Sequence, residues 1–192
     1  MLSTARLETF SDGVLAIIIT IMVLELGVPH EASIHALGEL TPVFLAYALS
    51  FVNLGIYWNN HHHMLATQGN VTGGMLWANL HLLFWLSLFP FMTAWMGEND
   101  FASVPVAFYG AVSLMAAIAY YILQLTIIRS QGPDSPLAAA VGRDAKGKMS
   151  PVLYAAGIIA AHPLRALSLI LYVVVAVMWL VPDRRIERTI GT

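Results

Sequence analysis

Long apolar runs separated by short polar stretches constrain this chain more than any other feature of its sequence. A helix needs about 20 mostly apolar residues to cross the hydrocarbon core of a bilayer. Six such runs predict transmembrane helices over residues 7–28, 42–62, 72–96, 104–128, 150–162 and 164–181. The fifth run is the shortest, and Pro151 and Pro163 bound it, so we expect it to be tilted or to span incompletely. The expected fold is an all-α membrane protein with a single six-helix domain over residues 1–192.

The composition agrees with a membrane protein and excludes several functional classes. Of the 192 residues, 58% are hydrophobic and 10% are charged, whereas a soluble domain carries about 25% charged residues. Cysteine is absent, which excludes a disulfide framework, a thiolate metal site and a cysteine nucleophile. The chain has no basic tract and no glycine-rich phosphate loop, so we expect no nucleic-acid partner. We also expect the first apolar run to be retained as a helix, because no Lys/Arg cluster precedes it.

Lysine and arginine are unevenly divided between the two sides that six spans define. If the N-terminus is inside, Arg165 alone of the nine falls outside, and the inner side carries Arg6, Arg129, Arg143, Lys146, Lys148, Arg184, Arg185 and Arg188. The positive-inside rule therefore predicts that both termini are cytoplasmic. The outer loops hold Glu31, Glu39, Glu98 and Asp100. These acids either concentrate cations or simply keep the loops solvated.

Asp12 and Glu25 are ionisable residues at membrane depth in the first span, with Asp12 near its inner end and Glu25 near its outer end. Ionisable groups at membrane depth are costly and usually face protein or water. Arg6 and Asp12 are six residues apart, so they do not face each other on one helix and each needs a partner elsewhere. Asp12 is then either a buried anchor for helix packing, or a proton relay or ion ligand.

An apolar stripe also follows from the geometry of the first span. At about 100° per residue, one narrow face carries Ile17, Thr20, Ile21 and Leu24. Asp12 points roughly 140° away from Ile17. Taken alone, such a stripe is ordinarily a lipid-facing or packing surface.

Polar residues also mark the second and third spans. The second ends in a run of three histidines, His61 to His63. Consecutive residues on a helix diverge by about 100° and do not share one ion, so we expect no metal site. Asn79 lies in the third span, where polar side chains commonly form hydrogen bonds between helices. We expect one network of Ser11, Asp12, His61 and Asn79 at the inner ends of three helices.

These residues resemble the signature of the transmembrane protein 175 family, which comprises the endolysosomal potassium channels and their prokaryotic relatives. The first motif is the run Arg6, Phe10, Ser11 and Asp12. Supporting residues are Trp58 and His61 at the end of the second span, and Asn79 followed by Leu88-Phe89-Pro90-Phe91 in the third. The resemblance covers about the first half of the chain. A single six-helix unit resembles the prokaryotic members, which assemble as homotetramers.

The resemblance implies a pore formed by the first helices of four subunits, without a re-entrant selectivity loop. Rings of Ile17, Ile21 and Leu24 would then line it, with the Thr20 hydroxyl beside them. The motif residues Arg6, Ser11 and Asp12 would belong to a hydrogen-bonded network behind the pore helix. A closed apolar ring excludes water and blocks ions. The expected function is therefore a modestly potassium-selective leak channel that uses this constriction as gate and filter.

Two other functions use the same residues. A proton channel or proton-coupled transporter would carry protons on Asp12, Glu25 or a histidine. Against a transporter, the sequence shows no clear repeat and no pair of broken helices to mark a midplane site. An enzyme would have few resources besides the three histidines, so we expect no catalysis. We expect potassium and membrane lipid as partners and no cofactor.

Overall fold

The computed structural model describes residues 3–66, 71–132, 135–141 and 144–180. Within these ranges the chain forms helices and no strand. The helices are α1 (Thr4–Leu24), α2 (Ile34–Glu39), α3 (Thr41–Ala66), α4 (Gly73–Ser87), α5 (Phe89–Glu98), α6 (Ser103–Gln131), α7 (Pro136–Val141), α8 (Ala145–Ala160) and α9 (Arg165–Leu180). The expectation of an all-α fold is confirmed for the described residues. The short helices α2 and α7 were not expected.

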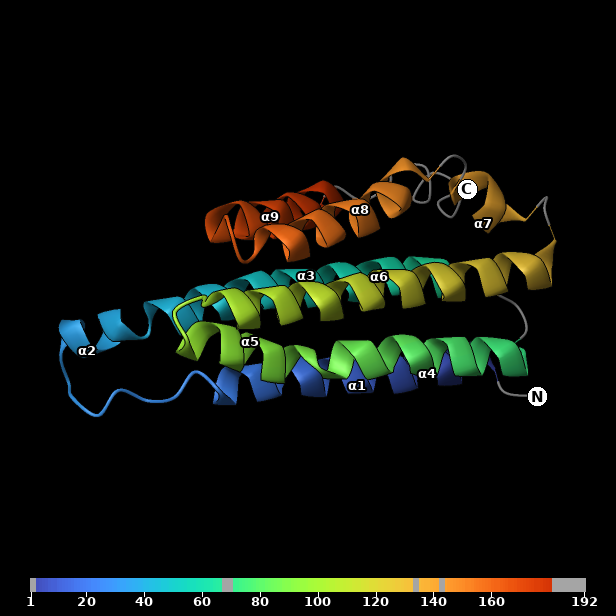
Figure 1. The fold of residues 1–192 in the computed structure, drawn as a ribbon. Coiled ribbons are helices and arrows are strands. Elements are labelled where there is room, and N and C mark those ends of the chain that lie inside the picture. The colour runs from blue at the N-terminus through green and yellow to red at the C-terminus, as the bar shows by residue number, and fades with distance from the viewer. Residues whose placement is uncertain (1–2, 67–70, 133–134, 142–143, 181–192) are drawn as a thin grey trace.

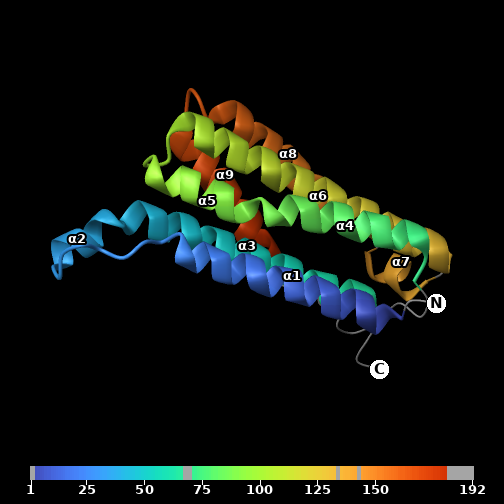
Figure 2. The same ribbon diagram turned by 90° about the horizontal axis from the view of Figure 1, so that it is seen from below.

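The long helices run side by side in three layers (Figure 1). Helices α3 and α6 form the middle layer, α1 with α4 and α5 lies on one side, and the α8–α9 hairpin lies on the other. The view from below shows α1 alongside α3, with α2 projecting beyond the bundle (Figure 2). Helix α1 packs on α3, α4 and α5, whereas α8 packs on α6 and α9. One side of α1 therefore has no neighbour among the described helices.

Among the described residues, four helical stretches are long and apolar enough to cross a membrane: Thr4–Leu24, Thr41–Ala66, Gly73–Glu98 and Ser103–Gln131. They correspond to the first four expected spans. Helices α8 and α9 have 16 residues each, which cover roughly 24 Å at 1.5 Å per residue against a hydrocarbon core of about 30 Å. The chain is thus a helical membrane protein, and six crossings remain a prediction.

Two of the expected spans, the first and the third, differ from the structure. Helix α1 ends at Leu24 rather than residue 28, because Gly27 adopts a left-handed φ of 68° that stops the helix. The third span is interrupted at Leu88, because Pro90 lacks the N–H that would continue the helix and its ring crowds the preceding turn. A single interrupted helix is not the pair of broken helices that would mark a midplane site. The last position of the sixth span, residue 181, lies outside the described residues.

The fifth span also begins earlier than expected. Helix α8 starts at Ala145 because Asp144 caps it, its Oδ1 accepting a hydrogen bond of 2.9 Å from the Gly147 N–H. Pro151 lies inside the helix. Its missing N–H removes one bond of the ladder but does not end the helix here.

The described lysine and arginine residues are divided unevenly between the two ends of the bundle. The start of α1, the end of α6 and the start of α8 lie at one end, which carries Arg6, Arg129, Lys146 and Lys148 (Figure 1). Arg165 lies at the opposite end, where its Nη1 donates to the Asp100 carbonyl over 3.4 Å. The remaining cationic residues of the expected inner side, Arg143, Arg184, Arg185 and Arg188, lie outside the described residues.

Candidate functional site

Helix α1 has one buried face and one exposed face. Its buried residues, spaced three or four apart, are Leu7, Ser11, Leu15, Ile18 and Met22, and they pack on α3, α4 and α5. The exposed stripe includes Ile17 and Leu24, which are 59% and 78% exposed. Thr20 and Ile21 lie on the same stripe and are also exposed. The four residues predicted to line a pore thus project away from their own bundle, where they are available to solvent, lipid or another subunit.

The Thr20 hydroxyl has a defined orientation on this stripe. It donates a hydrogen bond of 2.9 Å to the backbone carbonyl of Ile17. Because its hydrogen is committed to the helix, the oxygen presents lone pairs to whatever lies beyond the exposed face. A ring of such oxygens would be suited to partial coordination of a cation.

Behind the stripe, a buried network joins three helices. The Asn79 amide nitrogen of α4 donates to the Ser11 hydroxyl of α1 over 2.9 Å. The Asn79 carbonyl oxygen lies 2.7 Å from His61 Nε2 of α3. Since that amide oxygen can only accept, His61 carries its hydrogen on Nε2 in this arrangement. The three residues are nearly inaccessible to solvent, so the network fixes how α1 is oriented against α3 and α4.

Asp12 is not part of this network, contrary to expectation. Its Oδ1 instead accepts a hydrogen bond of 3.1 Å from Trp58 Nε1. The reason is angular, because Asp12 lies one residue beyond Ser11 and points about 100° away from it. Arg6 is exposed and forms no ion pair with any described residue. Phe10 is 53% exposed and lies on the same exposed side of α1 as Ile17.

The three consecutive histidines have three different surroundings. His61 is bonded to Asn79, His62 pairs with Glu8 of α1 over 2.5 Å, and the ring of His63 lies edge-on to that of His62. No group of three or more acidic or histidine side chains is placed to hold a metal ion within the described ranges. The Glu8–His62 pair was not anticipated from the sequence, although Glu8 lies one turn before Asp12.

An acidic hollow lies at the opposite end of α1. It has a volume of about 640 Å³, and its carboxylates are Glu25, Glu31, Glu39 and Glu98. His35 also borders the hollow and pairs with Glu39 over 3.5 Å. The fold therefore gathers three of the loop acids around the end of the exposed stripe, together with Glu25. Asp100 is not among the lining residues.

A second buried polar group, not anticipated from the sequence, lies deeper in the bundle. The Tyr109 hydroxyl of α6 accepts hydrogen bonds from Ser50 Oγ at 3.1 Å and Asn53 Nδ2 at 3.0 Å, both from α3. Thr93 of α5 donates to Ser50 over 2.6 Å. The signal in the sequence is the occurrence of Ser, Asn and Thr inside otherwise apolar runs, which requires partners within the protein.

The first half of the chain matches a known family. Residues 6–90 match the model of the endosomal/lysosomal potassium channel TMEM175. A potassium channel of Chryseobacterium sp. (strain P1-3) is 51% identical over 189 residues, which are 98% of either chain. The chain belongs to the TMEM175 family. The resemblance deduced from the motif of α1 is thereby confirmed, and with it membership among the prokaryotic relatives.

Two further TMEM175 relatives extend the comparison. A potassium channel of Streptomyces collinus is 36% identical over 138 residues, covering 68% of this chain and 67% of its own. The crystal structure of a lysosomal potassium-selective channel TMEM175 homologue from Chamaesiphon minutus superposes with a TM-score of 0.82 at 28% identity, covering 94% of this chain and 97% of the other. The whole described bundle, including the α8–α9 hairpin, therefore has the fold of a TMEM175 protein.

Proposed function

We propose that this chain forms a potassium-selective, leak-type cation channel with the exposed stripe of α1 as its constriction. The observation that carries the proposal is the stripe itself, since Ile17, Ile21 and Leu24 project away from the bundle while the opposite face of α1 is fixed by packing and by the Ser11–Asn79–His61 network. The relatives named as potassium channels support the permeant ion.

Four subunits would bring four copies of the stripe to a common axis. A homotetramer is the assembly proposed here, because one chain supplies a single copy of α1. The proposal includes six crossings per chain and both termini in the cytoplasm of a prokaryotic plasma membrane. The cationic end of the bundle, with Arg6, Arg129, Lys146 and Lys148, would face inward.

The constriction accounts for both gating and modest selectivity. A closed ring of Ile17 excludes water, and an ion does not cross a dewetted neck without losing hydration. A small radial or rotational shift of α1 opens the ring. Potassium loses its water more readily than sodium, and the outward-facing Thr20 oxygens partly replace that water. The acidic hollow beside Glu25 raises the local concentration of cations at the outer entrance.

A proton channel, or proton-coupled transport, is the second candidate function. The endosomal/lysosomal proton channel TMEM175 of Gallus gallus is 40% identical over 75 residues, which are 33% of this chain and 15% of that protein. Proton transfer would use Asp12, Glu25 or the histidines, and the Glu8–His62 pair places further titratable groups beside α1. A proton current that persists in potassium-free solution would favour this candidate.

The test is a reversal potential across a bilayer containing purified protein, under opposed potassium and sodium gradients. We expect a potassium-biased potential that moves towards zero in Ile17→Asn, with a larger current because the polar ring is hydrated. Val23→Asn is the matched control, since Val23 is 47% exposed on the same helix but points about 120° from Ile17. An unchanged potential in conducting Ile17→Asn channels would exclude Ile17 as the filter. A permeability ratio of potassium to sodium near one in the wild type would exclude potassium selectivity.

A further inference from the structure

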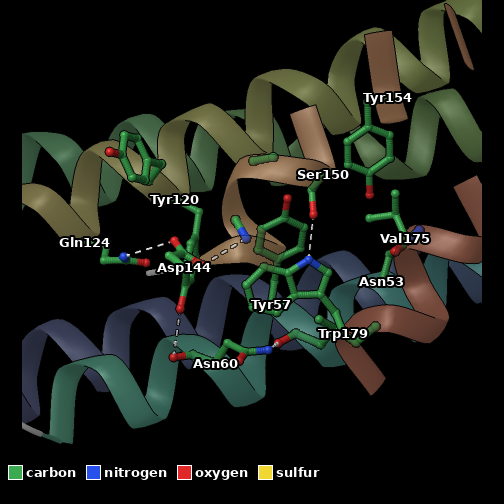
Figure 3. Close-up of a pocket in the computed structure, with 14 residues that line it drawn as sticks. Asn53, Tyr57, Asn60, Tyr120, Gln124, Asp144, Ser150, Tyr154, Val175 and Trp179 are labelled. Carbon is green, nitrogen blue, oxygen red and sulfur yellow. Dashed lines mark hydrogen bonds between the residues drawn. The ribbon is translucent and has the colours of Figure 1, made fainter. Parts of the chain in front are cut away.

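A cavity lies on the far side of the bundle from the exposed stripe of α1, enclosed by α3, α6, α8 and α9 (Figure 3). Its volume is about 50 Å³, which is room for roughly four water molecules. Its lining comes from the halves of these helices nearest the cationic end of the bundle, including Tyr57 of α3, Gln124 of α6, Ser150 of α8 and Trp179 of α9. The site is therefore separate from the proposed pore.

Aromatic rings form much of the wall of this cavity. Tyr57 and Tyr120 meet edge to face with ring centroids 6.0 Å apart, and Tyr120 meets Trp179 in the same way at 6.4 Å. Successive rings are thus close to perpendicular, as the walls of a cage are. The Trp179 indole lies near the middle of the lining, where its Nε1 donates to Ser150 over 2.8 Å (Figure 3).

A single carboxylate borders the aromatic wall. Asp144 is the one charged residue among the described residues that line the cavity. It accepts hydrogen bonds from the Gly147 N–H at 2.9 Å and from Gln124 Nε2 at 3.5 Å. Its backbone is held in the left-handed region, with φ 37°. A carboxylate offers about four acceptor positions, so these two bonds leave acceptor capacity for a cation.

We propose that this cavity binds an alkylammonium group, with the methyl or methylene carbons against the rings of Tyr57, Tyr120 and Trp179 and the charge beside Asp144. Electron-rich aromatic faces attract such cations, and cages of two or three rings are a recurrent way to bind quaternary ammonium. The chain already uses this chemistry at one ring, since Lys146 Nζ lies 6.0 Å from the centroid of Trp179.

The chemistry of the wall selects the class of cation. A metal ion holds its water strongly and favours several carboxylate and carbonyl oxygens, whereas Asp144 is the one carboxylate among the described residues of the lining. A trimethylammonium group surrounds its charge with methyl carbons, so it requires aromatic faces rather than a set of oxygen ligands. Two sources share this chemistry: the head group of a choline lipid in the adjacent leaflet, and a soluble quaternary amine such as choline.

The experiment uses full-length protein labelled with 5-fluorotryptophan in nanodiscs of phosphatidylglycerol, which has no ammonium group. The fluorine signal of Trp179 is assigned by its loss in Trp179→Phe. We expect choline chloride to shift this signal saturably, and its neutral carbon isostere 3,3-dimethylbutan-1-ol to bind at least tenfold more weakly. Equal binding of the two compounds would overturn the proposal, because the site would then be merely apolar.

Variants test the role of the carboxylate. Asp144→Asn removes the charge but keeps a residue that caps helices and tolerates a left-handed backbone, so we expect folding to persist and choline binding to weaken at least fivefold. Asp100→Asn is the matched control, because Asp100 also has a left-handed φ, 48°, and lies at the opposite end of the bundle. Undiminished choline binding in Asp144→Asn, with the other tryptophan signals intact, would overturn the proposal.

A second experiment distinguishes a lipid head group from a soluble amine as the source of the ammonium group. If nanodiscs containing phosphatidylcholine shift the Trp179 signal without added choline, the ammonium comes from lipid. A shift that requires free choline identifies a soluble ligand, and both results support the shared chemistry. No shift from either source would overturn it. The readout is binding, so the result does not depend on whether the chain conducts ions.

Discussion

The packing of Tyr172 offers a sharp test of how the α8–α9 hairpin is attached. Tyr172 of α9 is fully buried between Gly110 of α6 and Gly157 of α8. Its hydroxyl donates to the Val106 carbonyl over 3.2 Å. A Cβ added to Gly110 would lie 2.5 Å from Cζ of Tyr172 and closer still to the hydroxyl, and a Cβ on Gly157 would collide with the same ring. We predict that Gly110→Ala and Gly157→Ala each displace α9.

The expected loss of stability follows from these distances. Carbon atoms pack at about 3.5–4.0 Å, so the ring of Tyr172 must move by roughly 1 Å to accept either methyl group. Overpacking of this kind costs about 1–3 kcal/mol, and loss of the hydroxyl bond to Val106 adds about 0.6–1.7 kcal/mol. The gain in helix propensity from glycine to alanine offsets about 0.5–1 kcal/mol. The net destabilisation is about 1–4 kcal/mol.

Thermal unfolding in detergent, followed by near-ultraviolet circular dichroism, measures the effect. A change of 1 kcal/mol moves the Tm of a chain of this size by about 2–4 °C, so we expect each variant to melt roughly 2–16 °C below wild type. Gly55→Ala in α3 is the control, because no described atom beyond its chain neighbours and the adjacent backbone of α3 lies within 4 Å of the added carbon, and its Tm should hold or rise. If Gly110→Ala had the same Tm as Gly55→Ala, the close packing of α9 against these glycines would be wrong.

Three further predictions concern other contacts. Asn79→Leu removes the hydrogen bonds to Ser11 and His61 and should lower the free energy of unfolding by about 1–3 kcal/mol. The loss is measured as a lower Tm. An unchanged Tm would refute a structural role for the network. Thr20→Val keeps the side-chain shape but removes the outward-facing oxygen, so single-channel potassium conductance should fall several-fold, and an equal conductance would exclude coordination by Thr20. Gly97→Ala places a carbon 2.6 Å from the Cα of Val43. Because backbone yields less than a side chain, we expect a fall in Tm at least as large as for Gly110→Ala, and a smaller fall would contradict that reasoning.

The sequence predicted the helices better than their ends. Apolar runs are a property of neighbouring residues, so the first four spans were placed to within a few residues. The end of α1 and the break at Leu88 depend on single residues, Gly27 and Pro90, whose local geometry interrupts the helix. The early start of α8 depends on the Asp144 cap, which the apolar pattern does not register.

The candidate site shows a similar division. Helical angles alone placed Ile17 and Leu24 on one side of α1 and Asp12 on another. The partner that each polar residue finds was not available from those angles. Asp12 was expected to join Ser11 and is bonded to Trp58 instead, because the choice depends on which side chains of α3 and α4 come within hydrogen-bonding distance.

By itself, the sequence determined that this chain is a helical membrane protein and, through the motif of α1, its family. Both depend on local composition and on the short-range repeat of one helix, which no packing is needed to reveal. Only the tertiary structure decided which contacts hold α1 against its neighbours, how Tyr172 fits between two glycines, and that Asp144 and Trp179 meet around one cavity. Those features join residues that are tens of positions apart, and their distances depend on how whole helices pack.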